Sequence, residues 1–190
     1  MANWPFRAFL DASVLYPASL RNLLMRLTLA ELYQARWPAT VHDEWIRSLM
    51  RDRQELTKAK LEAVRDAMDL HAEDALVTGY EALVSGLVLP DPDDRHILAA
   101  AIVAGANVIV TRNLRDFPAE ILADHDIEAR HPDAFIRDLI DLAPAMVVDA
   151  VRDQQAALRN PPIPMPDLLA LFERLGLLTT TIELRRLMYG

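Results

Sequence analysis

The sequence predicts an α/β domain with a mainly parallel central sheet flanked by helices, followed by a helical C-terminal extension. Between residues 6 and 130, short apolar runs alternate with helix-length amphipathic segments, which is typical of parallel strands joined by helices. The run 107–110 is apolar throughout, as expected of a strand that is buried on both faces. Beyond residue 131 only helical patterns remain. We therefore predict one domain over 1–131 and a helical extension over 132–190.

The N-terminal part of the domain is predicted to begin with a strand and to continue with three helices. Phe6–Leu10 is a short apolar run that ends at Asp11. Apolar residues at helical spacing then predict helices over 19–34, 40–51 and 55–70. The last of these segments is charged on one side and apolar on the other, which is the pattern of a helix that packs on a core with one face.

Three more strands are predicted in the rest of the domain. They cover 86–89, where Pro90 ends the run, 107–110 and 126–130. Helices are expected over 91–103 and 118–123, and in the extension over 132–142, 144–158, 166–176 and 179–188.

Composition restricts the classes of function. Lys and Arg total 20 and Asp and Glu total 28, and the net charge of −8 argues against a nucleic-acid binder unless the acids are concentrated at a cation site. The absence of cysteine excludes disulfides and zinc–thiolate sites. No apolar run approaches the roughly 20 residues that span a bilayer. The N-terminus lacks the pattern of a signal peptide, so we expect a cytoplasmic protein without a membrane partner.

Acidic residues follow the predicted strands. Asp11 follows the first strand, the acidic segment 91–94 the second, and Asp116 the third. The carboxyl ends of parallel strands meet at one edge of the sheet, where repulsion between carboxylates is relieved by cations. Oxygen ligands without cysteine suit Mg²⁺ or Mn²⁺. Each acid alone could equally cap a helix or a turn, but their coincidence indicates a metal or phosphate site.

Three motifs, in this order, resemble those of the PIN-domain family. They are Phe9-Leu10-Asp11-Ala12-Ser13-Val14-Leu15, then Asp91-Pro92-Asp93-Asp94-Arg95-His96-Ile97-Leu98-Ala99-Ala100-Ala101, and Val108-Ile109-Val110-Thr111-Arg112-Asn113-Leu114-Arg115-Asp116-Phe117. Between them, His42-Asp43-Glu44-Trp45 stands where the family places its second acid on a helix. The resemblance covers roughly residues 6–130.

The resemblance implies a PIN-like three-layer sandwich and a ribonuclease of the VapC toxin type that cuts RNA with Mg²⁺ or Mn²⁺. Asp11, Glu44 and Asp94 match the metal-binding acids of the family, and Asp116 completes the acidic pocket. Asp94 is favoured over Asp93 because the apolar residues of the helix then fall at the right offset. Asp93 is the expected N-cap, although a shift by one position stays open.

The same motifs imply supporting residues. Many members of the family carry an acid where this chain has Asn113, so the number of bound metals stays open. Ser13 and Thr111 are expected to orient carboxylates or waters, and capping of a local turn is an equal alternative for Ser13. Arg112 and Arg115 are candidates for contacts with RNA phosphate, with solvated arginines as the alternative.

Proteins of the VapC type also imply partners. A cognate antitoxin, an RNA substrate and a homodimer are expected, and the C-terminal helices could bind the antitoxin, contribute to the dimer or complete the core. A catalytically inactive PIN-fold module that binds a protein is the alternative. A phosphatase with Asp11 as nucleophile is disfavoured because Ser13 stands where such enzymes carry a second acid. His96 is expected to be a surface histidine.

Overall fold

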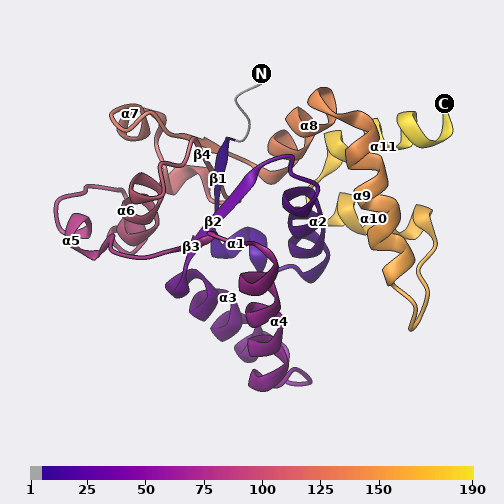
Figure 1. The fold of residues 1–190 in the computed structure, drawn as a ribbon, viewed down its shortest axis with the longest axis horizontal. Coiled ribbons are helices and arrows are strands. Elements are labelled where there is room, and N and C mark those ends of the chain that lie inside the picture. The colour runs from indigo at the N-terminus through magenta and orange to yellow at the C-terminus, as the bar shows by residue number, and fades with distance from the viewer. Residues whose placement is uncertain (1–5) are drawn as a thin grey trace.

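The structure, a computed structural model, describes residues 6–190. At its centre lies a five-stranded, fully parallel sheet in the order β3-β2-β1-β4-β5. Figure 1 shows α6 on one side of this sheet and α2 on the other, which confirms the predicted α/β architecture. The strands are β1 (Arg7–Leu10), β2 (Gln34–Pro38), β3 (Leu76–Val77), β4 (Val108–Val110) and β5 (Glu128–Arg130).

The helices fill the connections between the strands and make up the whole C-terminal part. In the first 131 residues they are α1 (Ala12–Leu15), α2 (Ala18–Leu29), α3 (Ala39–Asp52), α4 (Lys58–His71), α5 (Glu81–Val84), α6 (Arg95–Val103), α7 (Ala119–Ala123) and the 3-10 turns η1 (Pro92–Asp94) and η2 (Leu114–Asp116). The C-terminal helices are α8 (Pro132–Leu142), α9 (Pro144–Ala157), α10 (Met165–Arg174) and α11 (Leu178–Tyr189).

The order of connection reverses at the central strand. After β1 the chain adds β2 and β3 on one side, and it then returns to add β4 and β5 on the other side. Leu10 is in register with Val110, and the Asp11 amide donates to the Val110 carbonyl at 3.1 Å. The carboxyl ends of β1 and β4 therefore lie side by side at the point where open α/β sheets bind their ligands.

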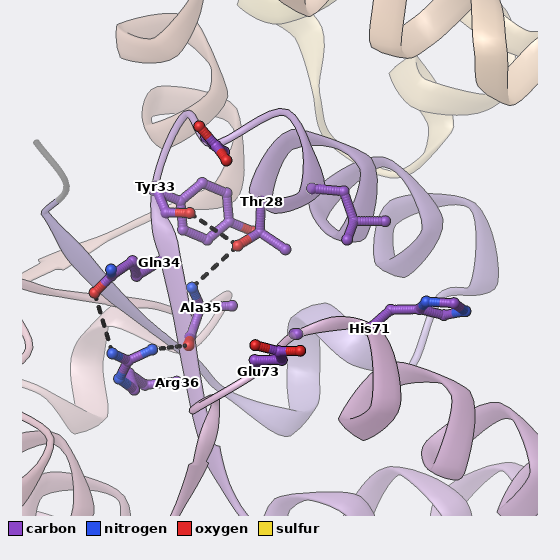
Figure 2. Close-up of a pocket in the computed structure, with 10 residues that line it drawn as sticks. Thr28, Tyr33, Gln34, Ala35, Arg36, His71 and Glu73 are labelled. Carbon is purple, nitrogen blue, oxygen red and sulfur yellow. Dashed lines mark hydrogen bonds between the residues drawn. The ribbon is translucent and has the colours of Figure 1, made fainter.

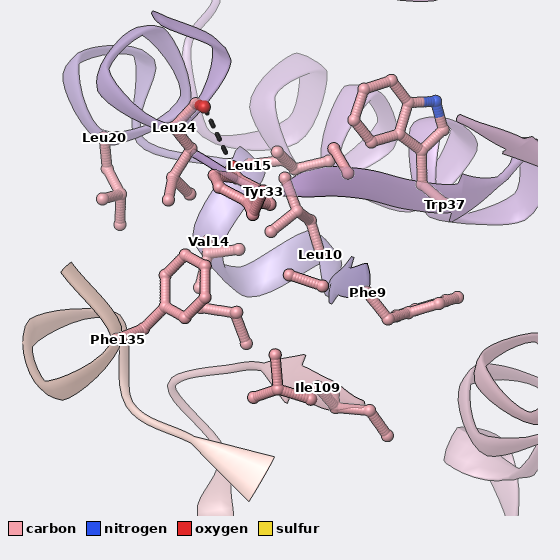
Figure 3. Close-up of a cluster of buried hydrophobic side chains, with 14 of the residues drawn as sticks. Phe9, Leu10, Val14, Leu15, Leu20, Leu24, Tyr33, Trp37, Ile109 and Phe135 are labelled. Atoms are coloured by element: carbon pink, nitrogen blue, oxygen red, sulfur yellow. Dashed lines mark hydrogen bonds between the residues drawn. The ribbon is translucent and has the colours of Figure 1, made fainter. Parts of the chain in front are cut away.

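The core of the sheet continues into the C-terminal helices. Figure 3 shows Leu10 and Ile109 from the sheet near Phe135 of α8. The Phe135 ring meets the Tyr33 ring edge-on, with centroids 5.0 Å apart. Leu169 and Phe172 of α10 are also fully buried in the same cluster of apolar side chains. The C-terminal helices thus complete the core, which was one of the expected roles.

Strand β2 was not predicted, and the helix predicted over 19–34 was too long. Helix α2 ends at Leu29, and Glu31 then adopts a left-handed backbone with φ of 58°. Glycine usually adopts that conformation at the end of a helix. Because this chain has Glu31 there, the sequence did not indicate where α2 ends. Residues 34–38 contain no Val, Ile or Thr, and Trp37 is the single strand-favouring residue among them.

The strand predicted over 86–89 was wrong. These residues follow α5 outside the sheet, and Val88 is 70% exposed. The edge beside β2 is taken by β3, which pairs Leu76 and Val77 with Trp37 and Pro38. A two-residue strand is too short to leave a periodic pattern in a sequence. The acids at 91–94 therefore follow a loop and not a strand.

The four C-terminal helices lie close to their predicted positions. Helix α8 begins two residues after β5, and α9 packs on α2, where the Gln154 side-chain amide donates to the Ser19 carbonyl at 2.9 Å. That 1–131 and 132–190 form separate domains stays a prediction. Within residues 6–190 no helix is both long and apolar enough to cross a membrane. The expectation about a signal peptide concerns in part residues 1–5, which lie outside the described residues.

Candidate functional site

A pocket of about 680 Å³ lies at the carboxyl ends of β1 and β4. Three of the four predicted acids line it, each from a different element. Its lining consists of Asp11, Ala12, Ser13, Tyr16, Glu44, Trp45, Ser48, Arg51, Asp52, Asp94, Arg112 and Asn113. The sheet edge thus brings together acids that are far apart in the sequence, as predicted from the sequence.

Asp11 is the most deeply buried acid of the pocket, with 7% of its surface exposed. The hydroxyls of Ser13 and Thr111 both donate to its Oδ2 atom, at 2.6 and 2.8 Å. Burial raises the pKa of the Asp11 carboxyl, the two hydroxyls lower it, and the nearby Glu44 carboxylate raises it again; the net shift is upward. The hydroxyls therefore fix the orientation of a carboxylate that is costly to bury as an anion.

Ser13 and Thr111 each form a second hydrogen bond, with a backbone amide of the turn after β4. Thr111 is fully buried and accepts the Asn113 amide at 3.0 Å, while Ser13 accepts the Arg112 amide at 3.0 Å. Each hydroxyl therefore binds Asp11 and also stabilises the turn after β4. The two alternatives considered for Ser13, orienting a carboxylate and capping a turn, are both present.

Asp94 reaches the pocket from the start of α6. A helix that joins two parallel strands runs antiparallel to them, so its N-terminus lies at their carboxyl edge. Asp94, and not its exposed neighbour Asp93, lines the pocket. The prediction that Asp93 is the N-cap of this helix was wrong, because Asp94 stands at the N-cap position of α6. Asp93 lies inside η1, where its amide donates to the Asp91 carboxylate at 2.9 Å. Proline at position 92 fixes this first turn.

The charge around Asp94 is strongly negative. Partial burial raises its pKa, and the carboxylates of Asp11, Asp116 and Asp91 raise it further, to about 6. Asp116 does not line the pocket, but its charge acts on Asp94 from η2. The four predicted acids therefore form one electrostatic group.

Glu44 contacts a histidine that the sequence did not single out as functional. His96 Nε2 lies 2.7 Å from Glu44 Oε1, and His96 Nδ1 lies 2.6 Å from the Asp93 carbonyl oxygen. Burial lowers the pKa of His96, but the contacts with Glu44 and the Asp93 carbonyl outweigh it and raise the pKa overall. The expected surface histidine is instead 21% exposed and paired. Nothing in the local sequence indicates this contact between α3 and α6.

The two predicted arginines are placed differently. Arg112 is exposed and lines the pocket, whereas Arg115 is exposed and does not. Helix α3 adds Ser48 and Arg51 to the lining, one and two turns after Glu44. The spacing of four and seven residues places them on the same face of α3 as Glu44, and by this periodicity the sequence could have indicated Ser48.

The residues of the pocket fit a divalent cation in chemistry. The donors are carboxylate, hydroxyl and amide oxygens, which hard cations such as Mg²⁺ and Mn²⁺ prefer. Within residues 6–190, no group of three or more His, Asp or Glu side chains is close enough together to hold an ion. Mg²⁺ commonly binds through one or two carboxylates and keeps several waters, so this spacing is compatible with it.

A second cavity, of about 440 Å³, lies away from the acids. Figure 2 shows it between the end of α2, the start of β2 and the end of α4, with Thr28, Arg36 and Glu73 around it. The Thr28 hydroxyl donates to the Tyr33 carbonyl and accepts the Ala35 amide, so this polar wall stabilises the turn into β2. None of the predicted site residues lines this cavity.

Comparison with known proteins agrees with this fold. A family model described as PIN domain matches residues 7–115, and a model described as VapC50 C-terminal domain matches residues 132–186. A protein of Mycobacterium tuberculosis (strain ATCC 25618 / H37Rv) named "Putative ribonuclease VapC50" is 44% identical over 68 residues. That match covers 36% of this chain and 40% of the relative. No solved structure matches the chain.

Proposed function

This chain belongs to the PIN-domain family, and from that premise we propose that it is a metal-dependent endoribonuclease that hydrolyses RNA phosphodiester bonds. The observation that carries the proposal is the convergence of Asp11, Glu44 and Asp94 in one pocket, with a pKa of about 6 for Asp94. Partial burial and repulsion between carboxylates together raise this pKa, as is typical of a site that binds cations.

Asp11 and Asp94 are the proposed principal ligands of Mg²⁺ or Mn²⁺. A bound divalent cation lowers the pKa of a coordinated water and neutralises charge that develops on the phosphate. The hydroxyls of Ser13 and Thr111 keep the Asp11 carboxylate oriented toward the pocket. Glu44 and Asp116 add negative charge, and Asn113 contributes an uncharged side chain to the lining.

The proposed path of the substrate follows the cationic side chains at the pocket. Arg112 lines the pocket from the turn after β4 and Arg51 from helix α3, and both are exposed. Arg51 also pairs with Asp52, at 2.8 Å. A guanidinium can bind a phosphate through two parallel hydrogen bonds. Arg115 is the weaker candidate, because it does not line the pocket.

The biological role that we propose is that of the toxin in a type II toxin–antitoxin pair. Its support is the relative named as a VapC ribonuclease and the C-terminal model that bears the same name. We further propose a cognate antitoxin, a homodimer and a cytoplasmic site of action, where the RNA substrate is found. The alternative is an inactive PIN-fold module that binds a protein, and the raised pKa of Asp94 argues against it because a scaffold gains nothing from repelling charges.

Substitution of the central acid tests the proposal. Asp11→Asn keeps the size of the side chain and removes its charge, and we expect Mn²⁺-dependent cleavage of single-stranded RNA to fall by about 100-fold or more. Asp43→Asn, at an exposed position beside Glu44, is the matched control and should cleave as the unchanged protein does. Full cleavage by Asp11→Asn would overturn the assignment, and no cleavage by the unchanged protein would favour the inactive module.

A further inference from the structure

His96 of α6 contacts Glu44 of α3, and its ring also contacts a backbone carbonyl oxygen. Its Nε2 atom faces Glu44 Oε1 at 2.7 Å, and its Nδ1 atom faces the carbonyl oxygen of Asp93 at 2.6 Å. The Asp93 carbonyl oxygen is a hydrogen-bond partner of Nδ1, and Glu44 Oε1 is in ion-pair contact with Nε2. A ring held at both nitrogens cannot turn away without losing a contact inside a partly buried site.

The three predicted acids that line the pocket therefore differ in which oxygen atoms are free to bind a cation. Glu44 already uses Oε1 in its contact with His96. Asp94 stands at the N-cap position of α6 but makes no capping hydrogen bond with its side chain. Asp11 receives both neighbouring hydroxyls on Oδ2. Of the three, only Glu44 has an ionisable partner in contact with its carboxylate.

We propose that His96 is a positioning residue that holds Glu44 away from the cation, so that Asp11 and Asp94 bind the cation directly and Glu44 acts on it through a water. This inference rests on the proposed function. It agrees with the lack, within residues 6–190, of three acids close enough to hold one ion. A water between the cation and Glu44 also suits Mg²⁺, which gives up its hydration reluctantly.

Two substitutions of His96 separate its contacts. Asn places its amide near the position of Nδ1 and can keep the bond to the Asp93 carbonyl, but it does not reach Glu44. Gln places its amide near Nε2 and can keep the contact with Glu44. In calorimetric titrations with Mn²⁺ alone, we expect His96→Asn to free Glu44 and lower Kd by about fivefold or more. His96→Gln should bind Mn²⁺ as the unchanged protein does.

Glu44 and Asp94 provide the second arm of the test. If Glu44 is kept off the cation, Glu44→Gln changes the Kd of Mn²⁺ by less than about threefold, whereas Asp94→Asn weakens binding by about tenfold or more. In the double variant His96→Asn/Glu44→Gln, the gain from His96→Asn should disappear, because the two residues act as one coupled pair. Far-ultraviolet circular dichroism of each metal-free variant checks that it is folded.

Each outcome decides the question. Equal losses of Mn²⁺ affinity in Glu44→Gln and Asp94→Asn would make Glu44 a direct ligand and overturn the inference alone. So would unchanged binding in a folded His96→Asn variant. If His96→Asn does not fold, the comparison of Glu44→Gln with Asp94→Asn still decides. Absence of Mn²⁺ binding in the unchanged protein would overturn the proposed function, and this inference with it.

Discussion

Asp94 takes its properties from residues that are distant in the sequence. Partial burial of its carboxylate and the charges of three other carboxylates together raise its pKa from 3.8 to about 6. The ionised carboxylate of Asp94 is therefore less stable in the folded protein than in the unfolded chain. A cation bound at the site attracts these carboxylates and offsets the repulsion between them, and this favours binding.

The contribution of Asp94 to the stability of the metal-free protein should therefore fall as the pH rises from about 4 to about 6. Between 3.8 and about 6 the folded state binds more protons at Asp94 than the unfolded state does, so rising pH lowers the free energy of unfolding. Urea unfolding in EDTA at a series of pH values measures the effect. Asp94→Asn removes the titrating group and should be stabilised relative to the unchanged protein as the pH rises. A constant difference between the two proteins across this range would contradict the prediction.

At the scale of the element, the acidic side chain of Asp133 joins α8 to α11. Asp133, in the first turn of α8, accepts the backbone amides of Thr179 and Thr180 at 3.0 and 2.8 Å and the Thr179 hydroxyl at 2.9 Å. Helix α11 has no capping side chain at its own N-cap, Leu177, so Asp133 supplies the cap from another helix. Burial raises the pKa of Asp133, but these hydrogen bonds outweigh it and hold the pKa below its usual value.

Asp133→Ala should destabilise the protein by about 1–2 kcal/mol, the usual effect of removing a cap that satisfies helix amides. Asp138→Ala is the matched control on the same helix: its side chain is 60% exposed and forms one long ion pair of 3.6 Å with Arg130. We expect Asp138→Ala to lower the free energy of unfolding by less than about 0.5 kcal/mol. Denaturant unfolding at neutral pH compares the two, and equal losses would show that Asp133 does not join α8 to α11.

At the scale of the whole molecule, the sheet and the C-terminal helices share one apolar core. Phe135 of α8 is 3% exposed and packs against the rings of Tyr33 and Phe6, at centroid distances of 5.0 and 5.9 Å. Helix α9 adds a hydrogen bond to α2. The contacts that join the two parts are as buried as those within each part. We therefore expect the N-terminal part and the C-terminal helices to unfold together.

Phe135→Ala should lower the stability of both parts by the same amount, about 3–5 kcal/mol, because it leaves a cavity where the two parts meet. Fluorescence of the buried Trp37 and Trp45 reports on the N-terminal part, and far-ultraviolet circular dichroism reports on all helices. The two transitions should coincide in the unchanged protein and shift together in the variant. Leu142→Ala, at a position on the same helix that is 54% exposed, is the control. Separate transitions would indicate independent domains.

The sequence predicted the helices well because their signal is local. Amphipathic spacing identified α3, α4 and all four C-terminal helices to within a few residues. Strands β1 and β4 were found for a similar reason, since their apolar runs end in polar residues. Strands β2 and β3 were missed because β2 has Trp37 as its single strand-favouring residue and β3 has two residues. Strand β2 is placed in the sheet by pairing with β1, and β3 by pairing with β2, and both are contacts between distant segments.

What the sequence by itself determined is the chemistry: carboxylates in a fixed order along the chain, without cysteine, in motifs that resemble one family. The tertiary structure alone decided how these groups meet. It turned Asp94 into the pocket and Asp93 out, paired Glu44 with His96, and covered α2 with C-terminal helices. The reason is that residue type and spacing act over a few positions of chain, whereas contacts between side chains on different helices depend on the packing of the whole core.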